Sequence, residues 1–159
     1  ADELGQLALS FNNMANSLIV GGLKCGMDVS VACPEGYDPD QQVLDFARTV
    51  TGCKFQLCRR PEEAAVDADV VITDVWASMG QEEEKVQREK AFAGYQVNAA
   101  LMALAHPGAM VQHCLPAHRE EEITAEVFEA HAGEIFDEAE NRLHAQKAVM
   151  YLLMGEETL

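Results

Sequence analysis

The sequence predicts one α/β domain whose mainly parallel sheet is doubly wound, with helices on both faces in a Rossmann-like, three-layer arrangement. Short runs rich in β-branched residues alternate with longer runs of helical periodicity along the 159 residues. Strands that are separated by helices pair in parallel through right-handed crossovers. We find no internal repeat, low-complexity tract or linker, so residues 1–159 are expected to form a single domain.

The first half of the chain supplies three predicted strands and three helices. Residues 7–9 read as the opening strand, and Asn12-Asn13 offers N-cap side chains for a helix over 14–24 that Gly26 closes. The run 28–33 alternates as a strand and ends at Pro34, and a helix follows near 43–50. The third strand covers 53–58, and Pro61 begins a short helix at a position that favours proline.

The second half continues the alternation. The run 68–73 is strongly β-branched, which predicts a central strand ending at Asp74. An exposed helix is expected over 81–93, with Glu84 and Arg88 paired at i,i+4, and another over 98–105. A strand leads into His113, a helix follows near 124–130, and a brief strand is expected at 134–136. The final helix repeats apolar residues at positions 139, 143, 150 and 153, which predicts a core-facing stripe.

Composition and charge indicate which kinds of binding partner and which cellular location are expected. The net charge of −16 repels phosphate backbones, which argues against nucleic acid as a partner. The apolar runs are far shorter than the roughly 20 residues of a membrane helix, and no signal peptide opens the chain. The five cysteines form an odd set without a C-x-x-C pair, which favours reduced thiols and a cytoplasmic location.

Polar residues gather where two predicted strands end, which is where open α/β sheets bind ligands. A carboxylate at Asp74 suits a substrate ammonium, and backbone N–H groups of the loop 78–80 suit a carboxylate. Spacing alone favours the plainer alternative, in which Asp74 caps the next helix and the loop only turns the chain. After the second strand, residues 113–119 place a thiol, two imidazoles and a guanidinium together.

Two chemical interpretations of this second segment are disfavoured. The spacing of His113, Cys114 and His118 matches none of the common zinc patterns, so no metal is expected. Neighbouring residues on a strand point to opposite faces, so His113 is not placed to act as a base for Cys114. A dinucleotide-binding domain is also disfavoured, because no G-x-G-x-x-G motif follows the first strand.

Three segments resemble signatures of the ornithine carbamoyltransferases, in the same order as in that family. His113-Cys114-Leu115-Pro116 resembles the HCLP motif, residues 74–81 resemble the substrate loop, and residues 138–146 resemble the last active-site helix. Two departures stand out, because residues 9–11 replace the family's Gly-Asp-Gly turn, and Glu120 stands where many relatives carry glycine.

The resemblance assigns roles by position. It implies that the amino-acid end of ornithine is bound by Asn13, Asp74, Ser78 and Met79. It further implies that backbone carbonyls of Cys114 and Leu115 accept hydrogen bonds from the carbamoyl NH2, and that Arg142 grips carbamoyl phosphate. The catalytic candidates are then Asp74, Cys114 and Arg142. Which of Asp74 and Cys114 accepts the proton of the amine stays open.

The implied reaction transfers a carbamoyl group from carbamoyl phosphate to the side-chain amine of ornithine, giving citrulline and phosphate, with no cofactor. The family's phosphate-binding Ser-x-Arg-Thr-Arg segment does not occur in these 159 residues. We therefore expect an ornithine-binding domain without its N-terminal carbamoyl-phosphate domain, and an isolated chain without turnover. The resemblance implies a homotrimer for the full-length protein and leaves arginine biosynthesis and breakdown both open. The alternatives are a carbamoyltransferase for another amine, such as putrescine, and a non-catalytic amino-acid-binding module.

Overall fold

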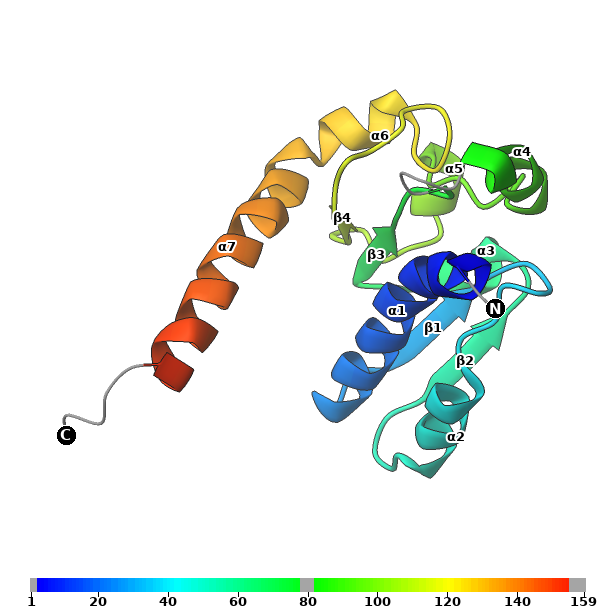
Figure 1. Ribbon diagram of the computed structural model, residues 1–159. Coiled ribbons are helices and arrows are strands. Elements are labelled where there is room, and N and C mark those ends of the chain that lie inside the picture. The colour runs from blue at the N-terminus through cyan, green and yellow to red at the C-terminus, as the bar shows by residue number, and fades with distance from the viewer. Residues whose placement is uncertain (1–2, 78–81, 155–159) are drawn as a thin grey trace.

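The computed structural model describes residues 3–77 and 82–154, with side chains described for 14–77 and 84–154. Four parallel strands and seven helices alternate over this part of the chain (Figure 1). Their order is α1 (Glu3–Lys24), β1 (Val29–Ala32), α2 (Gln41–Thr49), β2 (Phe55–Cys58), α3 (Pro61–Ala65), β3 (Val70–Thr73), α4 (Glu82–Ala91), α5 (Ala99–Met102), β4 (Met110–His113), α6 (Ala125–Ala130) and α7 (Ala132–Met154). The predicted α/β class with parallel strands is confirmed.

The strands form two separate parallel pairs. β1 lies beside β2, with Val29 opposite Phe55, and β3 lies beside β4, with Thr73 opposite His113. A continuous sheet would need a strand that joins the pairs, and no described residue supplies one. The prediction that 68–73 is a central strand is wrong, because β3 pairs with β4 alone among the described strands; Val70 and Ile72 of β3 are also exposed.

The predicted strands at 7–9 and 134–136 are also wrong, because both runs are helical. α1 already begins at Glu3, so Asn12 and Asn13 lie inside this helix instead of capping it. Leu, Ala, Gln and Glu around the first run are strong helix formers, and no proline or glycine separates the run from the helix that follows. Ile135 of the second run is fully buried on α7, where helical spacing brings it to the core.

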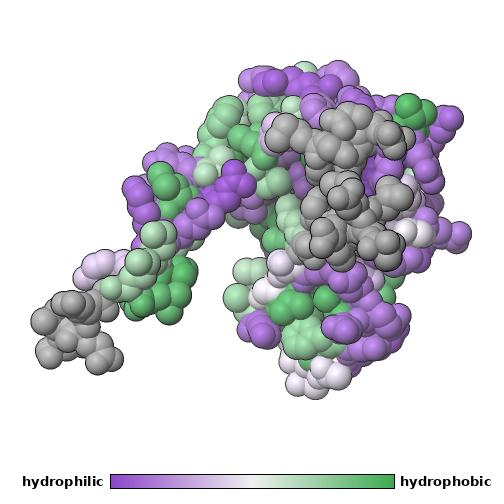
Figure 2. Space-filling view, in the orientation of Figure 1, coloured by the Kyte–Doolittle hydropathy of each residue, from purple (hydrophilic) through white to green (hydrophobic). Residues whose placement is uncertain are grey.

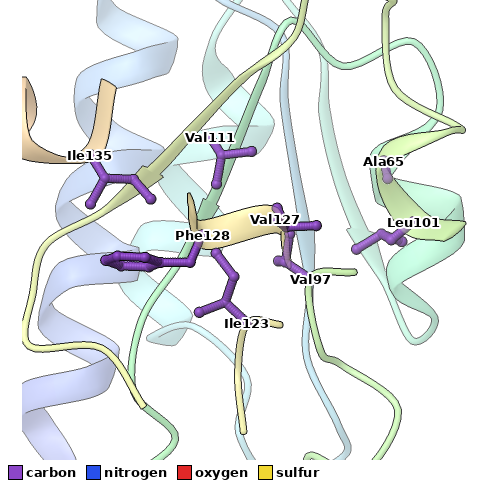
Figure 3. Packing of buried hydrophobic residues seen from close by; sticks show 8 residues of the cluster. All are labelled: Ala65, Val97, Leu101, Val111, Ile123, Val127, Phe128 and Ile135. Atoms are coloured by element: carbon purple, nitrogen blue, oxygen red, sulfur yellow. The ribbon is translucent and has the colours of Figure 1, made fainter. Parts of the chain in front are cut away.

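Two apolar clusters hold these elements together. Ile19 and Leu23 of α1 pack with Ala47 of α2 against β1 and β2. The larger cluster joins β4, α5, α6 and the start of α7, and Figure 3 shows Val111 and Ile135 beside Phe128 and Ile123 in it. The first turns of α7 are therefore fixed against β4, the strand that leads to Cys114.

The C-terminal half of α7 extends away from the rest of the molecule (Figure 1). The expected core-facing stripe is wrong for its outer part, because Leu143, Met150 and Leu153 are 51%, 58% and 80% exposed. Apolar side chains are visible on this extension in Figure 2. The periodicity is real, but no described part of the chain lies against the outer turns. None of the described helices has the length and apolar composition that crossing a membrane requires.

Candidate functional site

The ends of β3 and β4 bring together the two strongest predictions from the sequence. Thr73 and His113 are partners in the parallel register, so Asp74 and Cys114 are the next residues on adjacent strands. The Cys114 thiol donates a hydrogen bond to Asp74 Oδ1 over 3.0 Å, and the backbone N–H of Val75 donates to the same oxygen over 2.8 Å. Two segments that are 40 residues apart in the sequence thus meet in one contact.

The Cys114 thiol holds its proton strongly. Burial, the hydrogen bond to Asp74 and the negative charges of Asp74 and Glu138 raise its pKa to about 12, against an opposing effect of Arg142. A thiol with this pKa is protonated at neutral pH and has no site for a further proton. Of the two proton acceptors that the sequence left open, the Cys114 thiol is therefore unsuited, and Asp74 is the candidate that remains.

The predicted phosphate-binding residue Arg142 lies on α7, and its side chain is exposed. Its positive charge acts on the Cys114 thiol, so the guanidinium lies on the same side of the molecule as the Asp74–Cys114 pair. Arg119, the other arginine of the predicted motifs, contacts residues of α6. Its guanidinium lies 4.3 Å from the centroid of the Phe128 ring and pairs with Glu129 at 2.6 Å.

His113 does not contact the thiol beside it in sequence. Its side chain is fully buried, and its Nδ1 accepts a hydrogen bond from Leu115 N–H over 3.0 Å. Since Nδ1 is an acceptor, the ring proton is on Nε2, which donates to Glu122 Oε1 over 3.0 Å. The prediction that His113 is not a base for Cys114 agrees with this arrangement.

The same oxygen of Glu122 also accepts the backbone N–H of His118 over 2.6 Å. The turn 113–118 is therefore attached to one buried carboxylate at both ends, and Leu115 adopts a left-handed φ of 54° within it. Burial alone would raise the pKa of Glu122, but its hydrogen bonds from His113 and His118 outweigh burial and lower that pKa. Sequence reasoning missed Glu122; its only signal was the run of three acids directly after the motif.

The segment after Asp74 is held by aromatic packing. Trp76 stacks on Phe92 with 6.3 Å between the ring centroids, and Tyr37 meets the same ring edge-on. The predicted pair of Glu84 and Arg88 is confirmed at 3.0 Å, although Arg88 is buried. The predicted ligand-binding residues Ser78 and Met79 lie outside the described residues, as does the side chain of Asn13.

Two groups of potential metal ligands have their atoms within 4.8 Å of one another, namely Asp74 with His113 and Cys114, and His118 with Glu121 and Glu122. In the first group the thiol proton is donated to the carboxylate, and both imidazole nitrogens are engaged elsewhere. In the second, Glu121 pairs with Lys85 at 3.2 Å, and Glu122 Oε1 already accepts two donors. Glu122 Oε2 has no hydrogen-bond partner among the described residues, but the other potential ligand atoms of each group already serve protein contacts, so we assign no metal to either group.

Known proteins with similar sequences and structures include ornithine carbamoyltransferases of several organisms. The family described as aspartate/ornithine carbamoyltransferase, Asp/Orn binding domain, matches residues 8–153. The ornithine carbamoyltransferase of Geobacter sulfurreducens is 56% identical over 143 residues, which are 90% of this chain and 47% of that protein. This chain thus spans about half the length of the curated relatives that it matches.

Solved structures give the same result. The anabolic ornithine carbamoyltransferase of Campylobacter jejuni superposes with a TM-score of 0.85 at 39% identity, over 91% of this chain and 49% of that one. The enzyme of Pyrococcus furiosus superposes with a TM-score of 0.82 at 50% identity, over 89% of this chain and 46% of that one. With the match to residues 8–153, this chain belongs to the aspartate/ornithine carbamoyltransferase family and corresponds to its Asp/Orn binding domain.

Proposed function

We propose that this chain is the ornithine-binding half of an ornithine carbamoyltransferase. The longer enzyme transfers a carbamoyl group from carbamoyl phosphate to the side-chain amine of ornithine and releases citrulline and phosphate. The observation that supports this most directly is the 3.0 Å contact of Cys114 with Asp74 at the ends of two paired strands, with Arg142 acting on the same thiol. The similar proteins described above are ornithine carbamoyltransferases, which supports the same assignment.

The residue roles are part of this proposal. Asp74 binds an ammonium group of the amino acid, and Arg142 offers a planar set of donors to carbamoyl phosphate. The Cys114 and Leu115 carbonyls accept from the carbamoyl NH2. Asn13, Ser78 and Met79 keep the roles that the resemblance implies, to bind the amino-acid end of ornithine.

The attacking amine must lose a proton, because only about one alkyl amine in a thousand is neutral near pH 7. Asp74 is the group we assign to favour or accept that proton, since the Cys114 thiol with its pKa of about 12 is already protonated. The thiol then contributes a hydrogen bond that orients the Asp74 carboxylate toward the reacting groups.

The phosphate end of the reaction needs cationic donors beyond Arg142. We propose that residues 1–159 form a single ornithine-binding domain, and that a separate carbamoyl-phosphate domain supplies the missing donors. On this view the chain alone makes no measurable citrulline, and adding the carbamoyl-phosphate half restores some activity. Robust citrulline formation by the chain alone would contradict the proposal that a separate domain supplies these donors. The resemblance alone supports the further proposal of a homotrimer for the longer protein.

Calorimetry on the purified chain tests the binding function. We expect ornithine to bind and putrescine, which lacks the carboxylate, to bind at least about tenfold more weakly. Asp74→Asn should weaken ornithine binding by about tenfold or more, because a charge-assisted hydrogen bond is lost. Asp45→Asn is the matched control, since Asp45 lies exposed on α2 and pairs only with surface groups. No ornithine binding to the unaltered chain, or equal binding of putrescine, would overturn the proposal.

A further inference from the structure

Glu138 has a carboxylate oxygen that is buried without a hydrogen-bond partner. Among the described residues, Glu138 Oε2 accepts no hydrogen bond, although solvent does not reach it. More than nine in ten buried polar atoms in folded proteins have a partner, and an unpaired buried carboxylate is costly. Such an oxygen is suited to a donor that arrives with a ligand.

The position of Glu138 on α7 places it beside the candidate site. It follows the buried Ile135 by three residues and precedes Arg142 by four, so all three lie along one side of the helix. Ile135 packs in the same cluster as Val111 of β4 (Figure 3), and Glu134 accepts the Val111 N–H over 2.9 Å. This side of α7 therefore lies along the strand that ends at Cys114.

The charges that act on Cys114 agree with a position of Glu138 beside the candidate site. The negative charge of Glu138 raises the pKa of the Cys114 thiol, after burial and Asp74, while Arg142 lowers it. Asp74 and Glu138 thus bring two carboxylates to a thiol that stays neutral, and Arg142 brings one guanidinium. One negative charge is left without a balancing cation among these four residues.

Ornithine has two amino groups, one on the α-carbon and one at the end of its side chain. A single carboxylate at Asp74 would have to bind the α-ammonium and also serve the side-chain amine, whose proton it is assigned to accept. We propose that Glu138 is a further substrate-binding residue, whose buried Oε2 accepts a hydrogen bond from the side-chain amine and holds it beside Asp74, which also binds the α-ammonium. This inference rests on the proposed function and extends it to the residue that distinguishes a diamino acid from an ordinary one.

The test compares two ligands that differ only at the amine. Norvaline has the α-amino group, the carboxylate and the three side-chain carbons of ornithine, but no terminal amine. Calorimetry on the purified chain should show tighter binding of ornithine than of norvaline. Glu138→Gln should weaken ornithine binding by about tenfold or more and change norvaline binding by less than about twofold. Asp74→Asn should weaken both ligands.

Glu140→Gln is the matched control, because Glu140 lies on the same helix, is exposed and, among the described residues, pairs only with His144, at 3.1 Å. It should leave both affinities unchanged. Thermal unfolding followed by circular dichroism reports whether Glu138→Gln folds, and Glu138→Asp, which keeps the charge, supplies a second variant if it does not. For Glu138→Asp we expect ornithine affinity between those of the unaltered chain and Glu138→Gln.

The outcomes separate the two proposals. If the unaltered chain binds neither ligand, the proposed function fails and this inference fails with it. If both ligands bind but Glu138→Gln leaves ornithine affinity unchanged, only the role of Glu138 is wrong. Equal weakening of both ligands together with a lower melting temperature would show that Glu138 supports the fold and does not recognise the amine.

Discussion

Replacing Glu122 with alanine tests whether one buried carboxylate holds the turn that presents Cys114. Glu122 and His113 are both fully buried, and Glu122 Oε1 accepts from His113 Nε2 and from the His118 backbone N–H. Glu122→Ala leaves the buried His113 donor without an acceptor, at about 1–3 kcal/mol, and removes the part-buried, charge-assisted bond from the His118 N–H, at about 1.5–3 kcal/mol. The expected loss in the free energy of unfolding is therefore about 2.5–6 kcal/mol, a large part of the roughly 5–15 kcal/mol that stabilises an ordinary domain.

Glu122→Gln separates the loss of charge from the loss of shape. The amide oxygen keeps one acceptor in place, but neutral hydrogen bonds are about half as strong as charge-assisted ones. We expect a loss of about 1–3 kcal/mol, smaller than for alanine. Urea unfolding followed by far-UV circular dichroism measures the free energy of unfolding of both variants. If the slope of that free energy against urea concentration is unchanged, the variants expose the same surface on unfolding as the unaltered chain.

The pH dependence has a defined sign. Hydrogen bonds lower the pKa of Glu122 in the folded chain from its ordinary 4.5, so the carboxylate stabilises the fold at neutral pH. That stability is complete above the ordinary pKa and is lost as the pH falls through the lower, folded value. Glu122→Gln should therefore lose less stability in acid than the unaltered chain.

The alanine variant gives the result that would refute the role of Glu122. If the free energy of unfolding of Glu122→Ala lies within about 0.5 kcal/mol of that of the unaltered chain, the buried carboxylate does not hold the turn that presents Cys114.

Three further predictions concern single residues. Glu120 has a left-handed φ of 70°, and its side chain accepts the Ala125 N–H over 2.8 Å. Glu120→Gly therefore relieves strain while losing this hydrogen bond, and Glu120→Ala only loses the hydrogen bond. In urea unfolding, the free energy of unfolding of the alanine variant should be about 1 kcal/mol lower than that of the glycine variant. The reverse order would show that the backbone at Glu120 is not strained. Cys114, with a pKa of about 12, should hold about a thousandfold less thiolate at pH 7.5 than a thiol of pKa 9 and react more slowly with iodoacetamide, with a rate that still rises above pH 10. Peptide mass mapping measures this rate, and a plateau near pH 9 would show an ordinary thiol. Asn16→Ala removes the acceptor of the Asp40 N–H, 3.1 Å away, and should cost about 1–2 kcal/mol in urea unfolding, with faster amide exchange at Asp40; unchanged exchange there would show that the bond is not formed.

The strands were predictable where turn residues bound an apolar run. Pro34 follows β1, and β3 and β4 end within one residue of the predicted positions at Asp74 and His113. The false strands at 7–9 and 134–136 are only three residues long. A run of three cannot separate a period of 2 from one of 3.6, and each run belongs to a longer helix, α1 or α7.

The exposure of α7 was not predictable from its periodicity. The pattern of Leu143, Met150 and Leu153 indicates an apolar stripe, but a stripe is buried only where another element lies against it. Glu122 and Glu138 were missed for a related reason. Acidic residues in charged surroundings are usually exposed, and nothing local distinguishes the few that tertiary packing buries.

The order of the residues is enough to show which chemical groups stand at the ends of which strands. The carboxylate of Asp74 and the thiol of Cys114 follow strands whose boundaries are local features, and the motif residues identify the family without any coordinates. The folded arrangement was needed to show that Thr73 lies opposite His113, and that the thiol therefore donates to Asp74 and has a pKa of about 12. Protonation and hydrogen bonding depend on the distance and burial of groups that are 40 positions apart, and packing sets both.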